Sequence, residues 1–211
     1  MQLKDVSVKP ASDYKACQVH SGLNIAVDPF LEEERVLDVF GDNLVSRGYL
    51  PVLVVIENRT TDRAFLVAKG DIQLLMDPGP AKSDTFPTQG TREIKDPALD
   101  VAREDSERQG NALLFQSGSL ALAGPIALPA IVFAAPLMAK AQEDAFIITR
   151  NLEKRELVDR TVYPGESHNG FIYFLLKKDS VPADVRGVRV KLKDMKTGEP
   201  LVFSISVPKG E

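Results

Sequence analysis

The sequence predicts a mainly β protein, a β-sandwich with a helical insertion that makes it α+β overall. Two blocks, at about 15–76 and 157–207, contain short apolar runs with strand-like alternation. The section between them, at about 77–156, contains a helix signal and a long apolar stretch instead. With 211 residues, 44% of them hydrophobic and 27% charged, the chain can bury one sizeable core. We therefore expect a single domain over residues 1–211.

Two helices are expected from one shared signal, an aspartate at the N-cap followed by a proline at the first helical position. The first would begin at Asp28-Pro29, carry acidic residues in its first turn and end at Gly41. The second would begin at Asp96-Pro97, cover residues 98–108 and end at Gly110.

Strands are expected in both blocks. In the first, residues 50–56 form an apolar strand that ends in the polar turn 58–62, and one or two returning strands follow over 65–76. In the second block, the runs and turns predict strands at 157–163, 171–176, 188–192 and 201–207, with turns at 164–166 and 197–200.

Two of these strands need cover on both faces. Residues 50–56 and 171–176 are apolar at nearly every position, whereas a sheet with one wet face should alternate. We expect both strands at the centre of the core, with the opposing sheet on one face and helices from residues 96–155 on the other. Residues 188–193 do alternate, with cations outward, which is typical of a strand near a sheet edge.

Some of these motifs resemble a known family. The run at 53–60, the Tyr-Pro-Gly-Glu-Ser motif at 163–167, the strand at 170–174 and the closing hairpin are similar to the telokin-like, immunoglobulin-like domains of bacterial cell-envelope lipoproteins and secreted proteins. The resemblance covers about 49–76 and 157–207. It implies an immunoglobulin-like sandwich that acts as a binding or structural module, and it offers no shared catalytic residues.

Metal and thiol chemistry find little support in the sequence. His20 and His168 stand apart from other ligand residues at a metal-binding spacing, and His168 beside a turn is expected to be a solvated loop histidine. Cys17 is the only cysteine and has little positive charge around it to lower its pKa, so we expect a buried or bystander thiol. No metal ligand is assigned.

The sequence contains no recognisable enzyme motif. Ser117 and Ser119 flank a glycine but do not form a nucleophile elbow, and no glycine-rich phosphate loop is present. The acidic runs at 32–34 and 100–107 fit capped, solvated helices better than catalytic carboxylate pairs. The sequence therefore predicts a protein that is not an enzyme, with no catalytic residues and no cofactor.

The formal net charge of −4 gives the chain no overall attraction to a phosphate backbone, so we do not expect nucleic acid as a partner. Basic residues nevertheless gather in the C-terminal hairpin region. They could face an anionic surface such as lipid headgroups, although an edge strand that discourages pairing explains them as well. These residues are Lys177, Lys178, Arg186, Arg189, Lys191, Lys193 and Lys196.

The segment 109–139 contains no charged residue and is long enough to span a membrane. Pro125, Pro129 and Pro136 interrupt it, and one crossing would separate the two strand blocks. We expect broken helices that pack on the sandwich, and the alternative is a surface that binds a partner or dips into a membrane. The candidate interaction residues are Leu114, Phe115, Leu128, Ile131, Phe133 and Leu137.

Three hypotheses on function remain open. The first is a non-enzymatic binding or structural module of the bacterial cell envelope, whose partner would be another envelope protein or a membrane surface. The second is a membrane-associating protein that docks through 109–139. The third is an enzyme whose site is assembled from residues far apart in sequence. The first implies export to the envelope by a signal outside this sequence, and a cytoplasmic location is the alternative.

Overall fold

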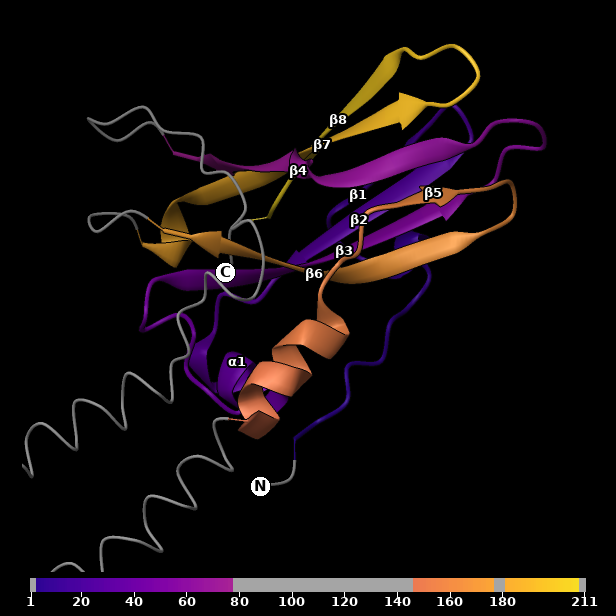
Figure 1. Cartoon of the computed structure of the whole chain (residues 1–211). Helices are drawn as coiled ribbons and strands as arrows, with labels where there is room; N and C mark the ends of the chain where they lie inside the picture. The colour runs from indigo at the N-terminus through magenta and orange to yellow at the C-terminus, as the bar shows by residue number, and fades with distance from the viewer. Residues whose placement is uncertain (1–2, 78–145, 177–180, 209–211) are drawn as a thin grey trace, which may run out of the picture.

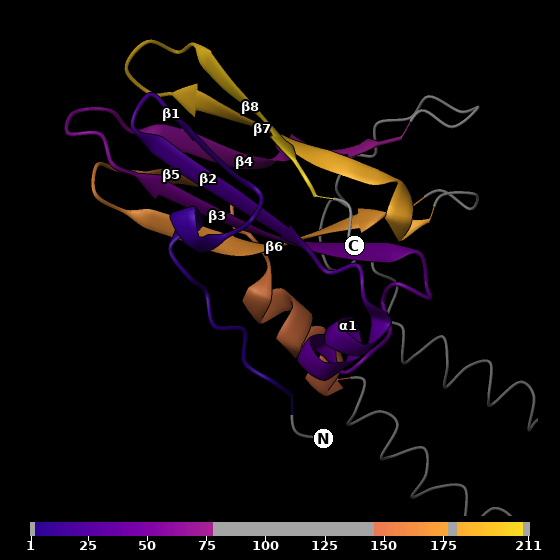
Figure 2. The same ribbon diagram turned by 180° about the vertical axis from the view of Figure 1, so that it is seen from behind.

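The computed structural model describes residues 3–77, 146–176 and 181–208, and within these ranges the chain forms a sandwich of two four-stranded antiparallel sheets. Two short α-helices lie on the outer side of one sheet (Figures 1 and 2). A mainly β sandwich, as predicted from the sequence, is confirmed. Sheet A has the order β1-β2-β3-β6, and sheet B has the order β5-β4-β7-β8.

Sheet A begins with a hairpin that the sequence prediction missed. It consists of β1 (Cys17–His20), β2 (Leu23–Pro29), β3 (Tyr49–Asn58) and β6 (Ser167–Leu175). Ser21 and Gly22 connect β1 to β2, and both have positive φ angles, 52° and 77°. Positive φ at both central residues is the mark of a type I′ turn, whose twist matches that of the flanking strands.

The first predicted helix exists but starts later than expected. Asp28 and Pro29 are the last residues of β2, and α1 covers Glu33–Phe40. The carboxylate of Asp28 caps no helix and instead accepts two hydrogen bonds from Arg35, at 3.0 and 2.5 Å. The predicted end is confirmed: Gly41 has φ 79°, and its N–H donates to the carbonyl of Leu37 at 2.8 Å.

Sheet B consists of β4 (Phe65–Met76), β5 (Arg160–Val162), β7 (Val185–Asp194) and β8 (Pro200–Ser206). As predicted, β7 lies near an edge, because its neighbour β8 is the edge strand, but β7 itself is paired on both sides, with β4 and with β8. Its cations therefore point out of the face of a paired strand. The predicted turn at 197–200 is confirmed, with Gly198 at φ 76°.

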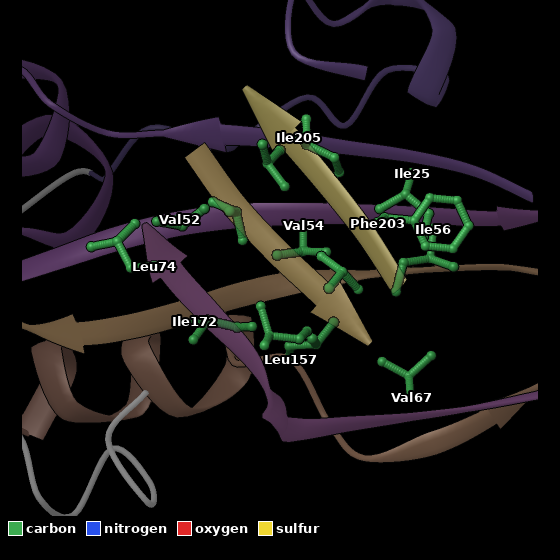
Figure 3. Packing of buried hydrophobic residues seen from close by; sticks show 14 of the residues in the cluster. Ile25, Val52, Val54, Ile56, Val67, Leu74, Leu157, Ile172, Phe203 and Ile205 are labelled. Atoms are coloured by element: carbon green, nitrogen blue, oxygen red, sulfur yellow. The ribbon is translucent and has the colours of Figure 1, made fainter. Parts of the chain in front are cut away.

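The main core fills the space between the sheets (Figure 3). Inward-facing residues of β3 meet those of β7 and β8, and Val54 and Val190 are both fully buried. Each large apolar side chain buried in this way stabilises the fold by about 1.5–3 kcal/mol. The labelled members are Ile25, Val52, Val54, Ile56, Val67, Leu74, Leu157, Ile172, Phe203 and Ile205.

A second core covers the other face of sheet A, as the doubly apolar strands required. Ile148 and Leu152 of the helix at 146–155 contribute to it, and so does α1, which the prediction had not placed there. Phe171 packs edge to face against Phe30 and Phe40, with ring centroids 5.0 Å apart in both pairs. Both predicted strands lie in the core, as expected: β3 is central in its sheet, and β6, although it is an edge strand, is buried on both faces over residues 171–174.

The edge of β6 that faces away from β3 contacts residues 156 and 157, which come before β5 in the chain. The N–H of Leu157 donates to the carbonyl of Phe171 at 2.8 Å, so the predicted strand 157–163 is really a short bridge followed by β5. Gly170 allows this approach, because a Cβ there would lie 2.6 Å from Cα of Leu157. The predicted strand is therefore divided: its start contacts sheet A, and residues 160–162 pair in sheet B.

The helix predicted at 98–108 and the apolar segment 109–139 lie outside the described residues. This includes the candidate interaction residues Leu114, Phe115, Leu128, Ile131, Phe133 and Leu137. Within the described ranges, no helix is long and apolar enough to cross a membrane.

Candidate interaction surface

The outer face of sheet B is the candidate site. Alternation along β7 places Val188, Val190 and Leu192 in the core, so Arg189 and Lys191 face outward with Lys193. The register sets these cations beside residues of the neighbouring strands. Arg189 lies between Gln73 and Ser204, Lys191 lies beside Val202, and Lys193 lies between Leu66 and Pro200. We call Arg189, Lys191 and Lys193 the cation row.

Members of the cation row have partners on their own face of the sheet. Lys191 lies 3.6 Å from the carboxylate of Asp71, and Arg189 donates to Oε1 of Gln73 at 3.2 Å. No ion pair of Lys193 is found among the described residues.

Three large apolar side chains are exposed on the same face. Tyr163 follows β5 and is 57% exposed, Met195 follows β7 and is 52% exposed, and Val202 in the middle of β8 is also 52% exposed. The N–H of Met195 donates to the carbonyl of Ala64 at 2.9 Å, and Tyr163 follows Val162, which pairs with Phe65. Aromatic residues, methionine and arginine are the types enriched at protein interfaces.

The turns that carry Tyr163 and Met195 are held rigidly. Asn58, which is 1% exposed, donates to the carbonyls of Arg63 and Val162 at 2.7 and 3.1 Å. Its side-chain oxygen accepts a bond of 2.6 Å from the Thr60 hydroxyl, and its backbone carbonyl accepts one of 2.8 Å from Gly165. The predicted polar turn is confirmed, and Asn58 connects it to the end of β5 and to the turn that follows.

The ion pair between Arg63 and Asp194 fixes the β7–β8 turn to the loop that contains Arg63. Both Nε and Nη2 of Arg63 donate to Oδ2 of Asp194, at 2.8 and 2.6 Å, while Oδ1 accepts the N–H of Lys196 at 2.8 Å. The backbone bond from Lys196 and the guanidinium of Arg63 lower the pKa of the Asp194 carboxyl. Rigid turns of this kind cost little ordering entropy when a partner binds.

His168 is not the solvated loop residue that the sequence suggested. It lies in β6, is 9% exposed, and its Nε2 is 2.7 Å from the carbonyl oxygen of Val158. Burial lowers the pKa of this histidine. Because a carbonyl oxygen can only accept, Nε2 is the donor in that contact. His168 therefore ties β6 to the segment before β5.

Cys17 is half-buried at the start of β1 and packs against the second core. Burial, and after it the charge of Glu57, raise the pKa of its thiol. Both effects disfavour the nucleophilic thiolate. No group of three or more metal-ligating side chains occurs in the ranges that the structure describes.

A groove of about 400 Å³ lies between the N-terminal segment and α1. Its charged side chains are largely engaged with one another: Lys4 pairs with Asp38, and Arg35 stacks on the ring of Phe30 at 3.6 Å while it binds Asp28. It is a weaker candidate than the outer face of sheet B, because its cations already have carboxylate partners.

The sequence indicates the basic residues of β7 but not the exposed apolar residues near them. Tyr163 ends the predicted strand 157–163 and begins the Tyr-Pro-Gly-Glu-Ser motif, and nothing in the sequence marks Met195 or Val202 as part of a surface. Single exposed apolar residues carry no signal until the register brings them onto one face. Comparison with protein-family models, with curated proteins and with solved structures finds no match for this chain.

Proposed function

We propose that the protein is a non-enzymatic binding module of the bacterial cell envelope, with an immunoglobulin-like sandwich, and that it contacts its partner through the outer face of sheet B. One observation carries the choice of surface: this face combines the cation row with exposed Tyr163, Met195 and Val202. The envelope and the immunoglobulin-like relationship rest on the resemblance of the motifs at 53–60 and 163–174.

The polar groups inside the fold support a binding role over catalysis. Asn58, Asp194 and His168 are the buried groups most suited to chemistry, and each is engaged in joining one part of the backbone to another. Tyr173 is similar, because its hydroxyl donates to the carbonyl of Leu152 at 3.1 Å. Polar groups used in this way rigidify a scaffold.

The test is cosedimentation of the purified chain with envelope fractions of the producing bacterium, both membrane vesicles and peptidoglycan. The wild type should pellet with one fraction, and a Tyr163→Ser/Met195→Ser variant should remain in the supernatant. Leu37→Ser is the matched control, because Leu37 is exposed on α1, at the opposite side of the sandwich.

Two outcomes would overturn the proposal. Equal binding by the wild type and the Tyr163→Ser/Met195→Ser variant would reject this face as the contact surface. A full-length product found entirely in the cytosol by cell fractionation would reject the envelope. Thermal melting of all variants confirms that the substitutions leave the fold intact, as expected for exposed positions.

A further inference from the structure

The edge strands of the two sheets differ in how well they are protected from other chains. β1 and β5 are short, with four and three residues, and the outer edge of β6 contacts residues 156 and 157. β8 is seven residues long and forms the upper margin of the sandwich in Figure 1. In the part of the chain that the structure describes, β8 has a strand partner, β7, on one side only. An edge of this length is a template for pairing with another chain.

Charge does not protect the edge of β8. Natural edge strands commonly carry lysine or other charged residues, which repel a second copy of the same strand. β8, from Pro200 to Ser206, contains no charged residue, although the neighbouring β7 contains several. Like charges would therefore not meet if β8 paired with β8 of a second copy.

The register shows which backbone groups of β8 are available. Odd-numbered residues face β7: the N–H of Val207 donates to the carbonyl of Arg186 at 2.8 Å, and the carbonyl of Glu199 accepts from Asp194 at 2.9 Å. Even-numbered residues therefore direct their N–H and C=O groups away from β7. One of these groups, the N–H of Ser204, donates to Oε1 of Gln18 in β1 at 3.1 Å. A single exposed contact of this kind is readily exchanged for a backbone hydrogen bond.

The sequence of the strand is nearly symmetric about Ser204. Pro200 and Pro208 lie four residues to either side, and because they lack an N–H they limit pairing to the residues between them. A second copy that runs antiparallel about Ser204 sets Ser204 opposite itself and Val202 opposite Ser206. On the inner face it sets apolar residues opposite apolar residues, in the pairs Leu201–Val207 and Phe203–Ile205. A two-fold interface requires this kind of self-complementarity.

We propose that β8 pairs with β8 of a second copy of this chain, antiparallel and about a two-fold axis at Ser204, so that the two sheets B form one continuous sheet. Residues opposite each other at even positions exchange two N–H···O bonds, and Ser204 gives up its contact with Gln18. The two β7 strands would lie about 14 Å apart, beyond the Debye length of about 8 Å, so their cations do not oppose the pairing. This dimer does not depend on the proposed function, and it would place two outer faces of sheet B side by side.

The experiment is sedimentation velocity of the full chain between about 1 and 200 μM, where a monomer–dimer equilibrium appears as a shift with concentration. We expect the wild type to dimerise. Ser204→Lys should raise the dissociation constant by about tenfold or more, because it sets like charges directly opposite each other. Ser206→Lys should raise it less, since that lysine meets Val202 of the second copy. Gln18→Ala removes the competing contact and should lower it by about threefold.

Matched variants separate an effect on pairing from an effect on folding. Ser7→Lys, the same change at an exposed position beside the groove at α1, should leave the dissociation constant unchanged. Ser204→Lys and Ser204→Glu should each be monomeric alone, and an equal mixture of the two should form a heterodimer, because opposite charges then face each other across the axis. Recovery in the mixture shows that both variants are folded.

Three results would overturn the proposal. The first is a wild type that stays monomeric over the whole concentration range. The second is a dimer that Ser204→Lys weakens no more than Ser7→Lys does. The third is a mixture of Ser204→Lys and Ser204→Glu that stays monomeric. None of these results bears on the envelope cosedimentation, which tests the outer face of sheet B through Tyr163 and Met195, so the two proposals can fail separately.

Discussion

The two sheets have the same number of strands but opposite relations to solvent. Sheet A is covered by sheet B on one face and by α1, the helix at 146–155 and the N-terminal segment on the other. Sheet B is covered on its inner face and exposes cations and apolar side chains on its outer face. Sheet A is therefore bound by packing on both faces, whereas the outer face of sheet B carries exposed side chains and can change without opening the core.

The sequences of the two central strands already carry this difference. β3 is buried at eight of its ten positions, whereas β7 alternates buried and outward residues over most of its length. The largest test is therefore a charge at Val54, which lies in β3 and is fully buried between the sheets. Val54→Asp should prevent folding, because an unpaired buried carboxylate costs several kcal/mol against a total stability of about 5–15 kcal/mol.

Circular dichroism and thermal melting check this result. A soluble Val54→Asp protein with a cooperative melt would show that β3 is not central. Lys191→Asp, a change to the same residue on the outer face of sheet B, is the control and should melt cooperatively.

The second test compares two glycines. A Cβ at Gly170 in β6 would meet backbone atoms of Leu157, whereas a Cβ at Gly70 in β4 has no atom within 4 Å. Gly170→Ala should lower the free energy of unfolding by about 1–3 kcal/mol, because the contact is with backbone that cannot turn aside. Gly70→Ala should be close to neutral. Urea unfolding of both variants measures the difference, and equal stabilities would contradict the close approach at β6.

Periodicity and turn residues predicted the sandwich, the buried β3, the wet face of β7 and the closing hairpin. They failed at Asp28-Pro29, where a helix-start signal was satisfied but the residues pair with Leu53 and Val52 in a sheet. Local propensity cannot detect a tertiary pairing of that kind. The same limit hid His168, whose position beside a turn suggested exposure although the segment before β5 covers it.

Only part of the candidate interaction surface could be predicted, again because a local pattern does not reveal tertiary pairing. Alternation within one strand revealed that Arg189, Lys191 and Lys193 share a face. Bringing Tyr163 and Val202 onto that face required the strand order β5-β4-β7-β8, and a single sequence does not encode strand order in any local pattern. The six apolar candidates at 114–137 lie outside the described residues and stay a prediction.

The third test is the pH dependence of stability that His168, in β6 of sheet A, contributes. Its pKa in the folded protein is lowered by burial, so below the unfolded value of about 6.5 the unfolded chain binds a proton more readily. This contribution to stability is present above about pH 6.5 and is lost as the pH falls through the lowered folded pKa. His168→Gln should reduce the drop in Tm between pH 7.5 and the acid side of that window. An unchanged drop would mean that other groups cause it.

The smallest effect comes from one substitution made in both sheets. Val52→Thr in β3 places a hydroxyl in a fully buried position between the sheets, and an unsatisfied hydroxyl there costs about 1–3 kcal/mol. Val202→Thr in β8 places the same group on the outer face of sheet B, where water satisfies it, so the change should stay within about 0.5 kcal/mol. Threonine suits a strand as well as valine does, so backbone propensity cancels from the comparison.

Urea unfolding of the two variants measures the difference directly. A Val202→Thr protein destabilised as much as Val52→Thr would show that the outer face of sheet B is packed against another part of the chain, and it would remove this face as a contact surface.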